Sequence, residues 1–495
     1  MVVKILLWLE GFSPQFATAK HISETIDCDM YAIINVNKAK EFYEKQKFVE
    51  FKKKWYFRDC FNKKPAKPDL DYLSKFEKKY NINLWRVANS DIIFNKFNKY
   101  YKFKAEEILS IFEQECKFFE GILDQVNPDF LIIRMTDSSD SQLIELICKA
   151  RGIKILTQWF SRLGLREVIS SEVDILDSNQ NNKINQIFTF KELQNYSEKY
   201  IEQEKEFREN FKTSKISWIK GTIEYLRMIN NSKYRMHYSN YGKNTLNVIK
   251  NESLFLLRSK IQNSFLKKYA KIKINKNEKF VYFPLQLEPE RTLFIPAPFY
   301  TNQLEVILNI AKSLPIDYVL YVKEHPMQAV YGWRNTSYYK KILELPNVIL
   351  IHPNFSNETL LENCQLVVTI GGTLGLEAAF NKKPSIVFID TIYSELPSVY
   401  RLKSLEDLPN AIKQSLKIEV NIDDLNLFIN KIISNSFKFD SESLGVLFNN
   451  EFYYGGFLFD HNVSIESAKE FLEKHKKLFE KLADEHIEKI YEYKH

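Results

Sequence analysis

A cluster of polar residues follows an apolar run near the middle of the chain and could bind a phosphorylated ligand. The run 318–322 has the length and composition of a buried strand, and it ends in Lys323, Glu324, His325 and Pro326. A cation, a carboxylate and an imidazole are therefore expected at the carboxyl end of a strand. Pro326 lacks an N–H donor and should end the strand there.

A second cluster lies about forty-five residues further on. The β-branched run 366–370 leads into a turn that contains Gly371, Gly372, Thr373 and Gly375, and residues 376–380 are typical of a helix. Glycine permits close backbone approach, and the first turn of a helix offers free N–H groups to an anion. Glu377, one turn into this helix, is better placed to accept hydrogen bonds from a ribose or sugar hydroxyl than to meet a phosphate.

The strands that position these clusters alternate with helices in both halves of the chain. The predicted strands are 2–9, 31–36, 129–135 and 153–157 in the first half, and 279–284, 318–322, 348–351, 366–370 and 384–389 in the second. This alternation is typical of α/β proteins with parallel sheets, which bind ligands at the carboxyl ends of their strands. We therefore expect a first domain at 1–190 with a helical insertion at about 39–121, bridging helices at 191–275, a second domain at 276–415 and a helical segment at 416–495.

Composition limits the classes of protein that fit. The chain has 495 residues, 45% of them hydrophobic and 27% charged, which favours two globular domains over disorder. A net charge of +7 without a nucleic-acid-binding motif argues against nucleic acid as a partner. The five cysteines form no CxxC pair, so neither a disulfide framework nor a zinc site is expected. A reducing compartment fits best, and with no run of about 18 apolar residues the protein should be soluble or peripheral.

A basic and aromatic stretch at 51–67, FKKKWYFRDCFNKKPAK, has two interpretations. It could contact anionic lipid or an acidic glycan, or it could be an ordinary solvated surface, which is the commoner use of lysine. Because a reducing compartment fits the cysteines, the protein is expected in the cytoplasm. If the basic stretch contacts lipid, it could work at the inner face of the membrane.

Four motifs together resemble the capsule polysaccharide biosynthesis family, which includes bacterial β-Kdo transferases. They are EGFSP at 10–14, FPLQLEPE at 283–290, KEHP at 323–326 and GGTLGLEAA at 371–379. Family members commonly continue the first motif with Trp-Lys, where this chain has Gln15 and Phe16. The resemblance implies a GT-B-like α/β fold, with two Rossmann-type domains facing a cleft. It also implies an enzyme that transfers sugar from a nucleotide-sugar donor to a capsular or lipid-linked polysaccharide acceptor, and carboxyl-terminal helices that cross back onto the first domain.

This chemistry assigns tasks to the candidate residues. The departing nucleotide gathers negative charge on phosphate, and Lys323, His325 and the amides of the glycine turn are donors suited to stabilise it. Three residues after the strand 279–284 could contact the donor, namely Gln286, Glu288 and Glu290. The acceptor hydroxyl must lose a proton, and Glu10 is the first candidate base, with Asp137 as the second. No DxD motif stands between the strands at this site, so a bound metal ion is not indicated. No cofactor is expected besides the substrate, which would be a CMP-, UDP- or GDP-linked sugar.

Several alternatives stay open at this point. A non-hydrolysing nucleotide-sugar epimerase shares the two-domain fold, and a non-catalytic protein that binds glycans or nucleotides could use the same scaffold. Arg162 and Arg166, near the end of the strand 153–157, could bind an anion or form ion pairs. His237 could face the acceptor, although a solvated or capping role is the commoner one.

Overall fold

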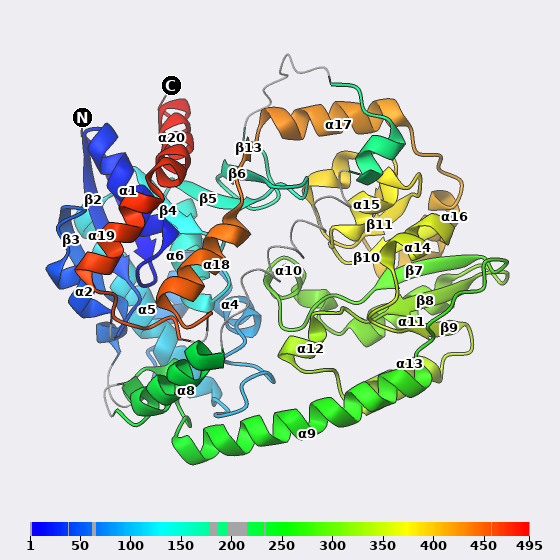
Figure 1. Cartoon of the computed structure of the whole chain (residues 1–495), viewed down its shortest axis with the longest axis horizontal. Coiled ribbons are helices and arrows are strands. Elements are labelled where there is room, and N and C mark those ends of the chain that lie inside the picture. The colour runs from blue at the N-terminus through cyan, green and yellow to red at the C-terminus, as the bar shows by residue number, and fades with distance from the viewer. Residues whose placement is uncertain are drawn as a thin grey trace.

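Two sheets, each covered by helices, make up the protein (Figure 1). The computed structural model describes residues 2–37, 39–61, 66–177, 186–195, 215–231, 234–456 and 458–494. The mixed α/β class with two sheets of mainly parallel strands, predicted from the alternation of apolar runs, is confirmed. In the described part of the chain, no helix is long and apolar enough to cross a membrane.

The first sheet has the order β3-β2-β1-β4-β5-β6-β13. Its strands are β1 (Val3–Leu9), β2 (Cys28–Ile34), β3 (Phe51–Tyr56), β4 (Phe130–Arg134), β5 (Lys154–Phe160), β6 (Arg166–Ser170) and β13 (Phe437–Lys438). The first five are parallel, whereas β6 and β13 pair antiparallel at one edge. The chain steps outward from β1 to β3 and then returns to place β4 on the other side of β1. The strand order therefore reverses between β1 and β4.

The second sheet has the order β9-β8-β7-β10-β11-β12, and all its strands are parallel. They are β7 (Phe280–Pro284), β8 (Val319–Lys323), β9 (Val348–Ile351), β10 (Leu366–Thr369), β11 (Ser385–Val387) and β12 (Val399–Arg401). Both faces of β7 and β10 are buried, which explains why these segments are continuous apolar runs. The strand order reverses between β7 and β10, as in a Rossmann fold.

Helices cover both sheets and join them. Those of the first sheet are α1 (Pro14–Thr25), α2 (Lys40–Lys45), α3 (Leu70–Tyr80), α4 (Leu84–Ser90), α5 (Ala105–Val126) and α6 (Ser139–Ala150). The connection contains α8 (Lys215–Ile229) and α9 (Thr245–Tyr269). The second sheet carries α10 (Arg291–Phe294), α11 (Gln303–Ser313), α12 (Gln328–Tyr331), α13 (Thr336–Leu343), α14 (Asn357–Asn363), α15 (Leu374–Phe380) and α16 (Leu408–Ser415). Residues 196–214 of the predicted bridging segment lie outside the described residues.

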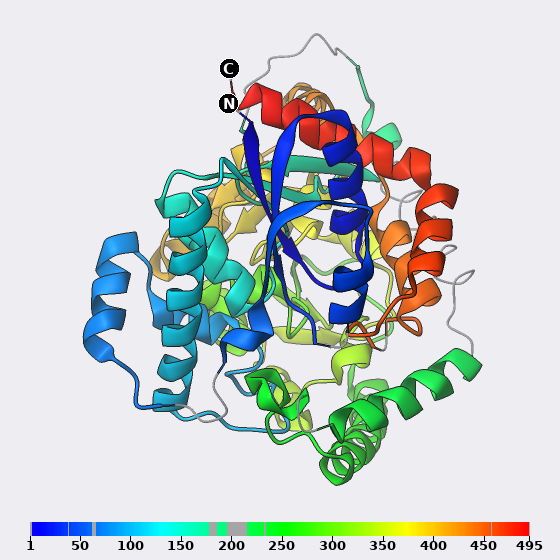
Figure 2. The ribbon, with the colours of Figure 1, turned by 90° about the vertical axis from the view of Figure 1, so that its left-hand side faces the viewer.

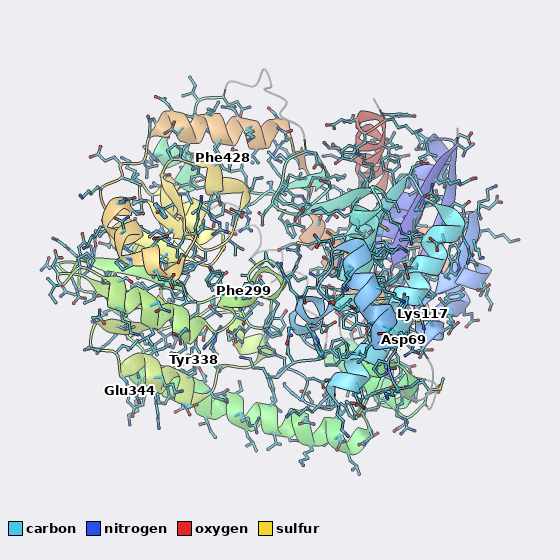
Figure 3. All side chains as sticks on the ribbon, turned by 180° about the vertical axis from the view of Figure 1, so that it is seen from behind. Asp69, Lys117, Phe299, Tyr338, Glu344 and Phe428 are labelled. Atoms are coloured by element: carbon cyan, nitrogen blue, oxygen red, sulfur yellow. The ribbon has the colours of Figure 1, made fainter. Side chains whose placement is uncertain are left out.

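The last helices divide between the two sheets. They are α17 (Ile422–Ser434), α18 (Ser441–Phe452), α19 (Ile465–Lys474) and α20 (Lys476–Glu492). Phe428 of α17 packs into the core beside the second sheet (Figure 3). By contrast, Phe448 and Phe471 join the core of the first sheet around Phe12, and α20 lies beside α1 (Figure 2). The carboxyl-terminal helices thus return to the first sheet, as the family resemblance implied.

Two short strands lie within the segments that were predicted to be helical. The stretch 39–121 contains β3, which extends the first sheet beside β2, and the tail contains β13. β3 holds Lys52, Lys53 and Lys54, and a strand at a sheet edge tolerates such charge because one side of it meets solvent. Charge on the exposed positions hid the strand pattern, and β13 is only two residues long.

Candidate functional site

The loop after β7 connects the two predicted ligand-binding clusters. The Gln286 side-chain Nε2 donates to the hydroxyl of Thr369 at the end of β10, at 3.1 Å. The backbone oxygen of Gln286 accepts a hydrogen bond of 2.6 Å from Arg334 Nη2. Arg334 in turn pairs with Glu324, which follows β8. Three strand ends, those of β8, β7 and β10, are therefore joined where the order of the second sheet reverses.

Glu324 serves this network rather than a ligand. The residue is 0% exposed, and its Oε1 receives hydrogen bonds from Arg334 Nη1 and from the backbone N–H of His325. Its Oε2 accepts from the Tyr339 hydroxyl at 2.7 Å. Because both oxygens are bonded inside the protein, Glu324 is a positioning residue, which differs from the predicted contact with the nucleotide.

His325 stands at the surface of the same turn, next to Pro326, which is exposed. Its Nδ1 accepts a hydrogen bond of 3.2 Å from the backbone N–H of Met327, so the neutral ring carries its proton on Nε2. Burial lowers the pKa of His325, and the cations Lys323 and Arg334 lower it further, against the opposing charge of Glu324. At neutral pH this imidazole is an uncharged donor.

Lys323 lies deeper than the sequence suggested. It is 4% exposed, its ammonium group donates to the amide oxygen of Asn357, and burial lowers its pKa to about 8. Lys323 forms no ion pair with any residue that the structure describes. The charge at this strand end is therefore held just below the surface, where it creates a field favourable to an anion.

The glycine turn after β10 is shaped by close packing. A Cβ at Gly375 would lie 2.7 Å from the Tyr393 hydroxyl, which itself donates to the carbonyl of Gly372 at 2.5 Å. A Cβ at Gly371 would lie 2.5 Å from the Ile389 side chain. Glycine is needed here because neighbouring side chains press against the turn. Thr373, at the start of α15, remains exposed to solvent.

Two carboxylates close to this turn, Glu377 and Glu290, stay partly exposed. Burial raises the pKa of Glu377 to about 7, and its carboxylate has no hydrogen-bond partner among the described residues. Burial also raises the pKa of Glu290, while the guanidinium groups of Arg162 and Arg291 oppose that rise. Glu288 is buried and accepts from Gln303 at 2.7 Å, so it supports the loop. Of the three predicted donor contacts after β7, only Glu290 is open to solvent.

The first sheet presents the candidate bases at its own reversal point. Glu10 directly follows β1, is exposed, and accepts a hydrogen bond of 3.2 Å from Trp8 Nε1. Asp137 follows β4, the strand next to β1, and pairs with Arg134 at 3.1 Å. Both carboxylates therefore meet solvent at the carboxyl ends of adjacent strands.

Asp140 is a buried carboxylate close to Glu10. Burial raises its pKa to about 7, the hydrogen bond from Ser138 opposes the rise, and the nearby charge of Glu10 adds to it. Asn35, at the end of β2, donates to Asp140 at 3.1 Å. Asp140 is thus a buried support for the strand ends that carry Glu10.

Contacts between the halves bring the two reversal points together. Arg162, after β5, pairs with Asp174 at 2.7 Å and also donates to the carbonyl of Gly371 at 2.8 Å. In the opposite direction, Arg291 of α10 donates to the carbonyl of Thr136 at 2.7 Å. The glycine turn and the loop that carries Asp137 consequently belong to one junction. The ion-pair interpretation holds for Arg162, although its guanidinium also reaches the predicted site.

Other predicted candidates are structural. Arg166 is buried and donates to Ser436 and to the carbonyl of Ile433. His237 is buried and accepts from the backbone N–H of Ser239, which is the capping role considered from the sequence. Sequence reasoning missed Arg334 and Gln303, because nothing in their local sequence marks a residue that binds a distant loop.

Three lysines of the basic stretch at 51–67 contact other residues of the protein. Lys52 lies 3.6 Å from Asp29, Lys54 lies 3.6 Å from Glu44, and Lys53 donates to Gln125 at 2.7 Å. Residues 62–65 of this stretch lie outside the described residues. The visible lysines fit an ordinary solvated surface.

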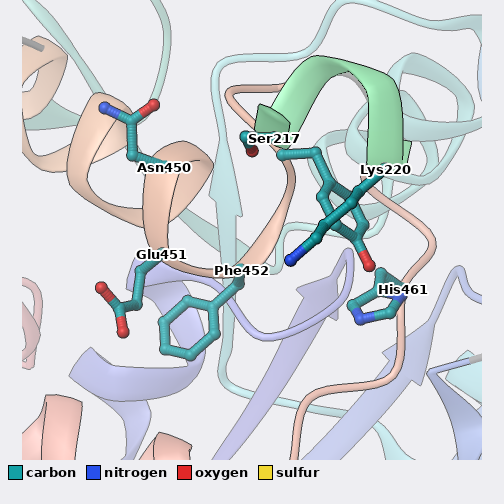
Figure 4. A pocket seen from close by; sticks show the side chains of 7 residues that line it. Ser217, Lys220, Asn450, Glu451, Phe452 and His461 are labelled. Atoms are coloured by element: carbon teal, nitrogen blue, oxygen red, sulfur yellow. The ribbon is translucent and has the colours of Figure 1, made fainter. Parts of the chain in front are cut away.

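A pocket of about 290 Å³ lies apart from these residues, between α8, α18 and the loop that follows α18 (Figure 4). It is lined by Ser217, Lys220, Asn450, Glu451, Phe452, Tyr454 and His461. Phe452 also packs on Phe12 of the EGFSP motif, with ring centroids 5.0 Å apart. The pocket therefore adjoins the first motif but contains none of the predicted site residues.

Solved structures with a similar arrangement include two epimerases and a transferase. UDP-GlcNAc 2-epimerase from Methanocaldococcus jannaschii is 13% identical, with 85% of this chain and 94% of that chain covered and a TM-score of 0.24. The Neisseria meningitidis UDP-GlcNAc 2-epimerase bound to UDP-GlcNAc is 12% identical, with 88% and 100% covered and a TM-score of 0.24. KpsC from Thermosulfurimonas dismutans, a beta Kdo 2,7 transferase, is 12% identical, with 64% and 90% covered and a TM-score of 0.28. At these scores the likenesses do not assign a reaction.

Sequence comparison identifies the family. No curated protein sequence matches the chain. Residues 176–410 match the model of a family described as capsule polysaccharide biosynthesis protein. The matched segment contains the FPLQLEPE, KEHP and GGTLGLEAA motifs, whereas EGFSP lies before it. The family resemblance seen in the sequence is confirmed over residues 176–410, which match the capsule polysaccharide biosynthesis family.

Proposed function

We propose that the protein is a glycosyltransferase that moves a sugar from a nucleotide-sugar donor to a capsular or lipid-linked polysaccharide acceptor. One observation carries the proposal. The three motifs of the matched segment meet at the reversal point of a Rossmann-like sheet, where such sheets bind nucleotides. Gln286 ties the motif loops together there, so the site is built before a ligand arrives.

The donor would lie with its phosphates near the turn after β8. His325 offers its Nε2–H, and the buried charge of Lys323 lies behind it. Both favour the charge that gathers on phosphate as the nucleotide leaves. Glu377 is suited to a ribose or sugar hydroxyl because its carboxylate is partly exposed and has no partner among the described residues.

The acceptor would approach from the first sheet. In the transfer step, the bond between the anomeric carbon and the phosphate oxygen breaks, and the electron pair leaves with the nucleotide. A new bond forms from the acceptor oxygen to the anomeric carbon, and the hydroxyl proton passes to Glu10. Asp137 is the second candidate for the base, on the neighbouring strand.

A panel of CMP-, UDP- and GDP-linked sugars tests the proposal. The protein is incubated with each donor, with and without an oligosaccharide acceptor, and free nucleotide and sugar products are measured. Acceptor-dependent release of nucleotide with a lengthened oligosaccharide supports the proposal. Isomerised donor sugar without an acceptor would instead identify an epimerase, and binding without any product would identify a binding protein.

The pH dependence of donor binding gives a finer test of the site. With the pKa of Glu377 raised to about 7, the ionised form that best accepts hydrogen bonds from hydroxyls is lost as the pH falls below 7. Loss of this form should therefore weaken donor affinity from pH 8 to pH 6, whereas Lys323, with a pKa of about 8, gains charge over the same range and should strengthen it. Glu377→Gln removes only the first effect, so its donor affinity should fall less, or rise more, than that of the wild type between pH 8 and pH 6. Glu395→Gln, at an exposed pair with Lys431, is a matched control.

A further inference from the structure

α9 is a long helix that connects the halves and buries little of its surface (Figure 1). Over its 25 residues only Val248, Gln262 and Leu266 are buried. Val248 packs with residues of α8, and Leu266 joins the core of the second sheet. These contacts fix one side of the helix and leave the other side to solvent.

The solvent side of α9 carries large aliphatic side chains. Leu246 is 81% exposed, Ile249 53%, Leu257 59% and Ile261 64%. A helix turns by about 100° per residue, which places these four within an arc of about 120° opposite the buried residues. Single exposed aliphatic residues are ordinary, but a row along one side of a helix is typical of an interaction surface.

The same side is strongly basic. α9 itself holds four lysines and one arginine against one acidic residue, Glu252, so its formal charge is +4. Four exposed lysines lie along the solvent-facing side, namely Lys250, Lys260, Lys267 and Lys268. Within the described part of the chain, none of the four forms an ion pair. Their charge is available to a partner.

We propose that this side of α9, named here the α9 surface (Leu246, Ile249, Lys250, Leu257, Lys260, Ile261, Lys267 and Lys268), binds an anionic lipid bilayer. The aliphatic groups would enter the boundary between head groups and acyl chains while the lysines stay level with the lipid phosphates. A second copy of the chain is the poorer occupant, because a twofold contact would bring two helices of charge +4 together.

Vesicle sedimentation of the full-length protein tests the proposal without any nucleotide sugar, so its outcome is independent of the proposed transfer reaction. We expect binding to phosphatidylcholine vesicles that contain phosphatidylglycerol, weaker binding to pure phosphatidylcholine, and a loss of binding as salt rises. Leu257→Glu with Ile261→Glu should weaken binding by about tenfold or more, and Lys250→Gln with Lys260→Gln and Lys267→Gln by a similar factor.

The triple variant Lys52→Gln, Lys53→Gln, Lys54→Gln on β3 is the matched control, because it removes equal charge from a lysine-rich surface whose ammonium groups have internal partners. It should bind vesicles like the wild type. Both α9 variants should keep the wild-type melting temperature, since the altered side chains are exposed. Unchanged vesicle binding by both α9 variants would overturn the proposal. So would a concentration-dependent dimer in light scattering that Leu257→Glu with Ile261→Glu abolishes.

Discussion

Loss of Arg334 should strongly weaken the second half of the protein. Its guanidinium is the cation that faces the fully buried carboxylate of Glu324, and it also holds the carbonyl of Gln286. Arg334→Met keeps much of the side-chain length but leaves that carboxylate without its counter-charge. Removing one partner of a buried ion pair costs about 3–5 kcal/mol.

Two contacts decide where in that range the cost lies. Glu324 would keep its hydrogen bonds from the Tyr339 hydroxyl and from the backbone N–H of His325, which still stabilise the charge. The carboxylate of Glu288, which is also buried and lies 3.5 Å from Arg334, would lose this cation as well. We therefore expect the free energy of unfolding to fall by about 4 kcal/mol. Nucleotide affinity should fall as well, because the Gln286 loop loses the donor that ties it to the turn after β8.

Urea unfolding followed by circular dichroism measures the change, and two further variants make the result specific. Arg227→Met removes a guanidinium that is 74% exposed beside Glu224, and should change the stability by no more than about 0.5 kcal/mol. Glu324→Leu with Arg334→Met replaces the whole pair by apolar groups and should be more stable than Arg334→Met alone. If Arg334→Met unfolds at the same urea concentration as Arg227→Met, the pair does not hold the loops together as argued.

Three other substitutions test the site and the fold. Glu10→Gln should lower turnover by about 10²-fold or more and leave donor affinity unchanged. Turnover and calorimetric donor affinity are measured on the same preparation. Full activity of the variant would assign the base to Asp137 or show that no protein base is needed. His325→Ala should weaken nucleotide binding at a nearly unchanged melting temperature, whereas a loss of several degrees with intact affinity would make the residue structural. Glu167 is buried, and burial raises its pKa to about 7. The folded state therefore binds more protons than the unfolded state between about pH 4.5 and 7, so stability should fall as pH rises through that range. Glu167→Gln should flatten the fall, and an unchanged slope would assign it to other groups.

The central strands could be predicted from the sequence because parallel strands buried on both faces are continuous apolar runs. Segments such as 280–284 and 366–369 carry that signal within a few residues. The strand β3 could not, since its three lysines have the pattern of a surface helix and only pairing with β2 makes it a strand. The order of strands in each sheet could not be predicted either, because it depends on pairing between segments that are distant in the sequence.

The candidate site divides in the same way. The turns at 323–326 and 371–375 are local motifs, and the structure places both at strand ends of one sheet. What Glu324 does depends on Arg334, ten residues away on the far side of a short helix, and no spacing rule links the two. The sequence suggests that the glycines in this turn allow a ligand to approach. In the structure, glycine is required because the side chains of Tyr393 and Ile389, more than ten residues later, leave no room for a Cβ atom.

The junction between the halves has a reciprocal design with a consequence for catalysis. Arg162 of the first half donates to the carbonyl of Gly371, and Arg291 of the second half donates to the carbonyl of Thr136. Each half thus binds a strand-end loop of the other through backbone oxygens, which are present whatever the side chains. The halves also share an apolar core in which Trp159 and Leu163 lie with Leu376 and Phe380, so separating them would expose apolar surface as well as break these bonds. The distance from Glu10 and Asp137 to the glycine turn is therefore set by the two hydrogen bonds and by this shared core together.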